Sequence, residues 1–197
     1  ELRPTGICGS GIIDLAAQMF RAGLLDFRGK MVPDRAAHLF VQEDGIWYFR
    51  LVPAKESGTN QDLLIGQPEI DSLIRSKAAM FTILETLVGS VGLGFDEVSA
   101  FFVAGTFGNF IKPESAITIG MLPDLPRLLF ESLGNSSLGG AVRLLQEPEV
   151  VREVSRIRAR ITYLELNVHQ AFMNQFSAAK FLPHTDGSRF PSVQVQV

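Results

Sequence analysis

The chain has 197 residues, 46% apolar and 20% charged, so it can bury a hydrophobic core and forms one or two globular domains. Its 18 Lys and Arg against 21 Asp and Glu give a net charge of -3 without a basic block, which argues against a nucleic acid partner. A single cysteine, Cys8, excludes an internal disulfide and an iron–sulfur cluster held by these residues alone. No apolar run approaches the roughly 20 residues that span a bilayer. We therefore expect a cytoplasmic protein without membrane contact.

The chain begins with a glycine-rich turn, Gly6-Ile-Cys-Gly-Ser-Gly11, that opens directly onto a predicted helix. The helix is expected from Ser10 to Leu25, because apolar residues recur there at helical spacing and Ser10 suits the N-cap. The first backbone N–H groups of a helix can hold an anion, which makes Gly9, Ser10 and Gly11 candidate cofactor-binding residues. The spacing matches neither a phosphate loop nor a dinucleotide fingerprint, so a tight corner is the preferred interpretation. The chain starts without an initiator Met, which suggests a piece of something longer.

A hairpin is predicted within residues 28–66. Two β-rich runs, 39–41 and 46–52, flank a Glu-Asp-Gly turn, and a polar loop over 54–62 follows them. A phosphate loop follows an apolar strand, and no such strand precedes this loop, so we interpret it as a surface turn. Residues 1–66 are therefore assigned to a subdomain with a glycine loop, a helix and a hairpin insertion.

A long helix is predicted to begin near Pro68 and Glu69, because Pro suits the first turn and an acid suits the positive helix end. Lys77 lies on the apolar stripe of this helix, between Ile74 and Phe81. A charge in that position must extend to solvent or meet a ligand, and extension to solvent is the commoner outcome. Lys77 is therefore a candidate ligand-binding residue.

A buried strand is predicted over residues 98–104, and it ends in a glycine turn that contains Gly105, Thr106, Gly108 and Asn109. Backbone amides at the carboxyl end of a strand allow a flat or anionic ligand to approach the chain closely. From the local spacing alone, a structural turn and a ligand site are both compatible with this segment.

Strands and helices continue to alternate in the rest of the chain, which predicts an α/β layer with ligands at the carboxyl ends of its strands. The expected elements are a helix over 113–119, a strand over 128–133, a helix over 136–146, a helix from Pro148, a strand over 161–166 and a helix over 168–181. Gly140 and Ala141 are small residues on one of these helices, where they favour close packing, either ordinary or at a moving domain contact. Residues 183–197 are expected to form a flexible tail.

Two classes of catalytic site are not supported. His38, His169 and His184 have no companion at metal-ligand spacing, so we expect no metal site. No nucleophile elbow with a Ser, His and Asp arrangement is present either, which argues against a hydrolase of that kind.

Several segments, taken in order along nearly the whole chain, resemble the carboxyl-terminal ATPase region of the reductive activators of corrinoid proteins. These belong to the sugar kinase, heat-shock 70 and actin superfamily. The matching segments are Gly6 to Asp14, Arg21 to Asp26, Ile74 to Met80, Val103 to Asn109, Glu114 to Pro123, Gly134 to Ala141 and Tyr163 to Leu166. The resemblance implies an α/β fold, a partial RNase H-like lobe of the actin and heat-shock 70 type over residues 67–182.

The resemblance also implies a function. Such activators use ATP and Mg to drive reduction of a cobalt(II) corrinoid to cobalt(I) for methyl transfer, with the electron supplied by a [2Fe-2S] cluster in a separate amino-terminal domain. The expected partners are a corrinoid protein or a corrinoid-dependent methyltransferase, with a homodimer also considered. The resemblance places Gly105, Thr106, Gly108 and Asn109 at the adenosine, Lys77 over it, and Gly140 and Ala141 at the hinge side between lobes.

Two departures from the family pattern limit what this chain can do alone. Thr106 stands where the family usually has a second glycine, and no Asp-x-Gly-Thr phosphate loop occurs in the sequence. Phosphoryl transfer depends on positioning and charge neutralisation, so we expect little or no hydrolysis without those loops. Two alternatives stay open: a docking or dimerisation module without a ligand, and an activator of another low-potential enzyme or a small-molecule kinase of the same superfamily.

Overall fold

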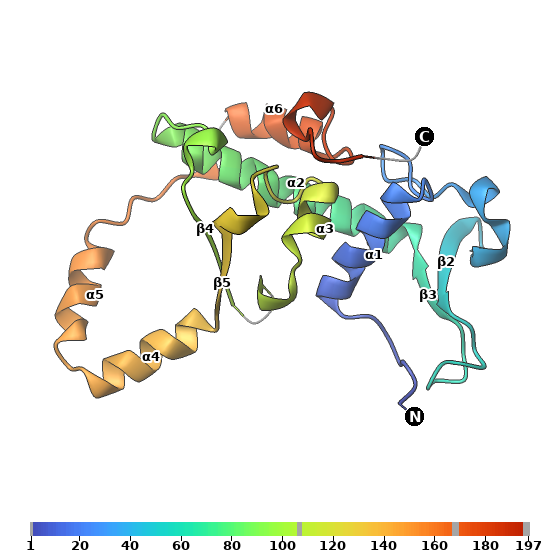
Figure 1. Ribbon diagram of the computed structural model, residues 1–197, viewed down its shortest axis with the longest axis horizontal. Helices are drawn as coiled ribbons and strands as arrows, with labels where there is room; N and C mark the ends of the chain where they lie inside the picture. Colours follow the sequence, from blue (N-terminus) through green and yellow to red (C-terminus); the bar gives the residue numbers. More distant parts are fainter. Residues whose placement is uncertain (1, 106–107, 167–169, 195–197) are drawn as a thin grey trace.

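The computed structural model describes residues 2–105, 108–166 and 170–194 (Figure 1). Its α-helices are α1 (Gly9–Arg21), α2 (Gln67–Ser90), α3 (Pro113–Thr118), α4 (Ser136–Gln146), α5 (Val150–Arg158) and α6 (Gln170–Ala179). Its strands are β1 (Phe40–Glu43), β2 (Ile46–Val52), β3 (Leu63–Gly66), β4 (Phe101–Ala104) and β5 (Phe130–Gly134). In the described part of the chain, no helix has the length and apolar content needed to cross a membrane.

The long helix α2 runs through the middle of the molecule, with α6 packed along it (Figure 1). The β1–β2–β3 hairpin sheet lies at one end, and α4 and α5 extend away from the body at the other (Figure 1). Helix α2 begins at the predicted place because Pro68 occupies its first turn and the Glu69 carboxylate accepts a hydrogen bond from the Gly66 N–H at 2.9 Å.

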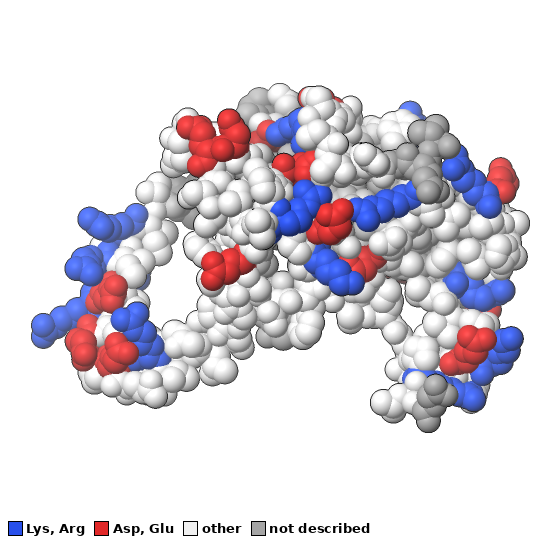
Figure 2. Space-filling view, viewed as in Figure 1, with Lys and Arg blue, Asp and Glu red and all other residues white. Residues whose placement is uncertain are grey.

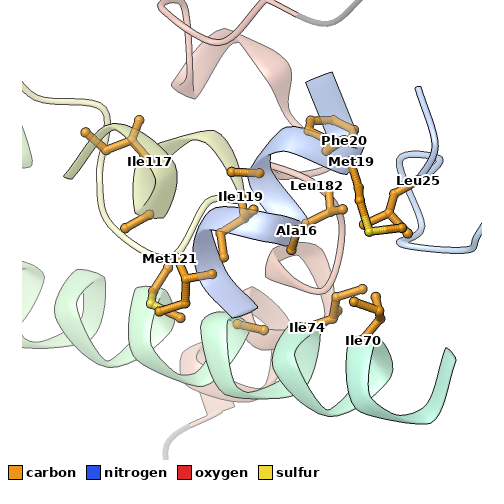
Figure 3. Close-up of a cluster of buried hydrophobic side chains, with 14 of the residues drawn as sticks. Ala16, Met19, Phe20, Leu25, Ile70, Ile74, Ile117, Ile119, Met121 and Leu182 are labelled. Carbon is orange, nitrogen blue, oxygen red and sulfur yellow. The ribbon is translucent and has the colours of Figure 1, made fainter. Parts of the chain in front are cut away.

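The apolar faces of α1, α2 and α3 share one hydrophobic core (Figure 3). On α1 the buried residues Ile13, Ala16 and Phe20 recur at helical spacing, and Ile70 and Ile74 of α2 face them. The amino-terminal helix and the long helix are therefore joined through a common interior. Further members of this core are Met19, Leu25, Ala78, Phe81, Ala116, Ile117, Ile119, Met121, Leu182 and Phe190.

Two small sheets complete the fold. The predicted hairpin is confirmed, with β1 and β2 antiparallel and Phe40 opposite Phe49. Strand β3 was not predicted from the sequence; it pairs with the other side of β2 and leads directly into α2. The second sheet is the parallel pair β4 and β5, in which Phe101 lies opposite Phe130 with ring centroids 5.0 Å apart.

Two expected strands differ from the structure. The strand β4 is shorter than predicted and only half-buried, with Phe102 58% exposed, because only β5 pairs with it in the described residues. Residues 161–165 form no strand, and Ile161 and Tyr163 are exposed. Their alternating pattern is that of a strand, but no partner strand lies beside them in the described part of the chain.

The expectation of a loose tail from Pro183 is wrong for the residues that the structure describes, up to 194. Phe190 is buried in the core against Phe81, and Arg189 forms an ion pair with Glu85 of α2. Ser192 donates through its backbone N–H and its hydroxyl to Asp124 at 2.8 Å and 2.6 Å. The Pro, Gly and Ser content of this segment suggested flexibility, but burial of the Phe190 ring in the core holds it in place.

Candidate functional site

A cleft of about 600 Å³ lies where the start of α1, one side of α2 and the carboxyl end of β4 meet. Both glycine turns singled out in the sequence reach it, one through Gly9 and the other through Gly108. The remaining lining residues are Ile12 and Ile13 of α1, Glu69, Ser72, Leu73, Ser76 and Met80 of α2, Val103 and Ala104 of β4, and Ile111 and Met121. The cleft is thus mainly apolar, with a few hydroxyl groups and exposed glycine backbone.

The α1 wall begins at the first residue of the helix, Gly9. The expectation that Ser10 caps α1 is wrong: Cys8 is the N-cap residue, no side chain caps the helix, and the Ser10 hydroxyl lies 3.4 Å from the Cys8 sulfur. This contact is the main reason that the pKa of the exposed Cys8 thiol is lowered. Gly11 faces Ile7 and Cys8, so it lies beside the cleft without lining it.

The residues of the α2 wall were not predicted from the sequence. Ser72, Ser76 and Met80 lie one turn apart on the same side of the helix and all three line the cleft. A signal was available, because these residues form a second stripe beside the buried apolar one, with Met80 46% exposed. The Ser76 hydroxyl donates to the Ser72 carbonyl at 3.0 Å, whereas the Glu69 carboxylate is occupied at the start of α2.

Lys77 lies on a different side of α2 from the cleft and is fully buried. Its ammonium group donates to the backbone carbonyls of Phe181 and Pro183, the latter at 2.7 Å. Lys77 therefore neither extends to solvent nor covers the cleft; it fastens the carboxyl-terminal segment onto α2. Burial lowers the pKa of Lys77 to about 7.

The β4 wall ends in the turn that was expected to approach a ligand. Gly105 has a positive φ of 94°, which favours glycine, and its N–H donates to the Gly134 carbonyl at 2.7 Å. Gly108 lines the cleft, and a Cβ at this position would lie 2.7 Å from a methyl carbon of Val103. The Asn109 N–H closes the turn onto the Gly105 carbonyl at 3.1 Å, and its side-chain oxygen accepts from Ser132 at 2.7 Å. Thr106 lies outside the described residues.

Gly140 and Ala141 do not contribute to the cleft. Both are exposed on α4, which extends away from the body (Figure 1), and nothing lies within 4 Å of a Cβ placed on Gly140. Within the described residues their small size therefore serves no close contact.

The cleft is suited to binding: among the described residues that line it, only Glu69 is ionisable, and its carboxylate accepts a hydrogen bond from the Gly66 N–H. Apolar side chains on the α1 and β4 walls, serine hydroxyls on the α2 wall and glycine backbone at both turns fit a flat, mainly apolar ring system with a few polar atoms. Among the described residues, no group of three or more His, Cys, Asp or Glu is placed to hold a metal ion.

Comparison with known proteins places this fold in the ASKHA class, the superfamily that the sequence motifs indicated. The chain belongs to the family defined by the C-terminal domain of RACo, the ASKHA domain, whose model matches residues 1–194. The fold class and the family expected from the sequence are both confirmed.

The chain is similar to two named proteins. The corrinoid activation enzyme RamQ of Eubacterium limosum is 32% identical over 180 residues, which cover 88% of this chain and 30% of that protein. A solved structure of a reductive activator for corrinoid, iron–sulfur protein matches with a TM-score of 0.91 and 42% identity, over 98% of this chain and 31% of that one. The chain thus spans about a third of the length of the relatives that it matches.

Proposed function

We propose that this chain is the carboxyl-terminal part of a longer ATP-dependent activator, which drives reduction of a cobalt(II) corrinoid protein to cobalt(I). The cleft between α1, α2 and β4 holds the adenosine of ATP in this proposal. One observation carries it: two glycine turns that are far apart in the sequence open into the same apolar cleft. Two relatives whose names describe corrinoid activation support the choice of substrate.

In this arrangement the described residues bind and orient the nucleoside. The apolar side chains of Ile12, Leu73 and Met80 would contact the base, and the hydroxyls of Ser72 and Ser76 would supply hydrogen bonds. ATP bound with Mg supplies the energy of the reaction, and the phosphate loops, absent from this sequence, would come from the rest of the activator. A separate [2Fe-2S] domain would deliver the electron, since the chain has one cysteine.

Titration calorimetry with ATP and ADP tests the binding site on this chain and on a chain extended at its amino terminus. We expect micromolar binding by the extended chain. Ser76→Trp, which fills the cleft, should abolish it, whereas Ser90→Trp on the exposed end of α2 should leave it intact. Nucleotide binding that survives Ser76→Trp would refute the assignment of the cleft.

The reduction itself is tested by the absorbance of cobalt(I). The extended protein, supplied with a reductant and ATP, should convert the cobalt(II) corrinoid protein to cobalt(I), and omission of ATP should stop the conversion. Conversion at the same rate without ATP would refute an ATP-driven activator.

A docking role is a second candidate, because apolar side chains are unusually exposed around α4. On α4, Leu145 is 85% exposed and Leu138 is 60% exposed. The same face could be covered by the rest of a longer activator or by a second copy in a homodimer. Sedimentation of this chain and of the extended chain distinguishes the two: a dimer of the extended chain supports self-association, and a monomer supports cover within one chain.

A further inference from the structure

Helix α5 carries a row of arginines along one side. Arg152, Arg156 and Arg160 follow one another at four-residue intervals, the last in the turn after the helix, and all three are exposed. Residues four apart lie on the same face of a helix, so the three guanidinium groups project in similar directions. None of them forms an ion pair within the part of the chain that the structure describes.

The apolar residues of α5 lie on the opposite side from this row. Val150 is already buried, and Val154 and Ile157 share its side of the helix. Any element that covers the apolar side, within a longer protein or in a dimer, would therefore leave the arginine row facing outward. Figure 2 shows Lys and Arg side chains along the outer edge of the α5 region, at the left of the view.

The charges nearby do not neutralise the row. The segment 143–160 contains five arginines, three glutamates and no lysine. Arg143 forms ion pairs with two of the glutamates, at 3.2 Å from Glu147 and 4.0 Å from Glu153. The row is therefore left with uncompensated positive charge in a protein whose net charge is -3.

The composition of the row favours a protein partner over a nucleic acid or a membrane. Arginine forms paired hydrogen bonds with carboxylates and is enriched at protein interfaces, where lysine is depleted. Nucleic acids and anionic lipid surfaces attract uninterrupted clusters of Lys and Arg, whereas glutamates are interspersed among the arginines here. The matching surface is one rich in Asp and Glu side chains.

We propose that the arginine row of α5 docks a carboxylate-rich surface of the corrinoid protein. The inference rests on the proposed function for the identity of the partner, and on the geometry of α5 for the chemistry of the contact. Pairing of exposed opposite charges mainly accelerates association and is weakened by salt. The row thereby accelerates association of the corrinoid protein with the activator. The docking surface on α5 is separate from the nucleotide cleft.

The test measures binding of each corrinoid protein of the source organism to the wild-type extended chain and to Arg152→Glu/Arg156→Glu, at low and physiological salt. The control is Lys55→Glu/Arg75→Glu, which changes the net charge equally at exposed positions elsewhere. We expect the α5 variant to weaken binding by about tenfold or more and to lose most of the salt dependence, because it removes two charge contacts. The control should change the affinity by less than about threefold, and both variants should bind ATP like the wild type.

The outcomes separate this inference from the proposed function. Salt-dependent binding that the α5 variant loses, without ATP-driven reduction by the wild type, supports the docking surface and refutes the activator. ATP-driven reduction with equal affinities for the α5 variant and the control refutes the docking surface and keeps the activator. No binding of any corrinoid protein by the wild type also refutes the docking surface, as does binding only to a DNA duplex or to phosphatidylserine vesicles.

Discussion

The buried amine of Lys77 provides the sharpest test of how this fold is held together. Its Nζ atom donates to the carbonyls of Phe181 and Pro183, and burial lowers its pKa to about 7. A neutral amine still has two N–H groups, one for each carbonyl, so loss of the proton costs neither hydrogen bond. We therefore expect the folded protein to prefer the neutral form above pH 7.

The sign of the pH dependence follows from proton binding. An unfolded lysine keeps its proton up to about its ordinary pKa of 10.5, whereas folded Lys77 loses it near 7. Between these values the unfolded chain binds more protons, so stability rises with pH by at most about 1.4 kcal/mol per unit. Over pH 7.5 to 9.5 the wild type should gain about 2.5 kcal/mol relative to Lys77→Met, which has no amine.

The substitutions also have a cost at neutral pH. Lys77→Met keeps the side-chain stem but leaves two buried carbonyls without this donor. The variant no longer has to desolvate an amine, which offsets part of that cost, so we expect a net loss of about 2 kcal/mol in the free energy of unfolding. Lys77→Ala also removes three methylene groups at about 0.8 kcal/mol each, so we expect a loss of about 4 kcal/mol. Urea unfolding followed by far-UV circular dichroism at several pH values measures both effects. If the stability of the wild type and of Lys77→Met changed with pH in parallel, the lowered pKa of Lys77 would be refuted.

Three further predictions concern the packing. Gly120→Ala should destabilise the protein by about 3 kcal/mol by thermal unfolding, because Gly120 has a φ of 73° and a Cβ there would collide with the Pro183 carbonyl; an unchanged melting temperature would contradict this. Phe190→Ala should cost about 3 kcal/mol and expose residues 183–194 to proteolysis, whereas an equally resistant segment would show that its anchor lies elsewhere. Arg127 and Arg21 lower the pKa of Glu114, so Glu114→Gln should reduce the loss of stability on acidification below pH 4.5; equal acid unfolding profiles would refute a role for this carboxylate.

The sequence predicted those elements whose pattern is local. The hairpin, α2, α3 and α4 all lie close to their expected bounds, because helical spacing, proline in the first turn and a tight turn are properties of neighbouring residues. The strand expected over 161–166 was wrong because a strand needs a partner, and nothing in the local pattern supplies one.

The candidate site was predicted in part. Gly9 and Gly108 do line the cleft, since glycine turns at element ends are visible in the sequence. Ser72 and Ser76 were missed because an ordinary serine on a helix carries no signal until another element faces it. Lys77 was noticed for the right reason, a charge on an apolar stripe, but the sequence did not contain its partners: backbone carbonyls more than 100 residues away.

The sequence by itself determined the family and most of the helices, because both depend on short motifs and local spacing. Only the tertiary structure decided which faces meet. It brought two distant glycine turns into one cleft, turned Lys77 away from that cleft, and packed the supposed tail through Phe190. Burial and hydrogen bonding between distant segments depend on the whole folded chain, so a local pattern cannot specify them.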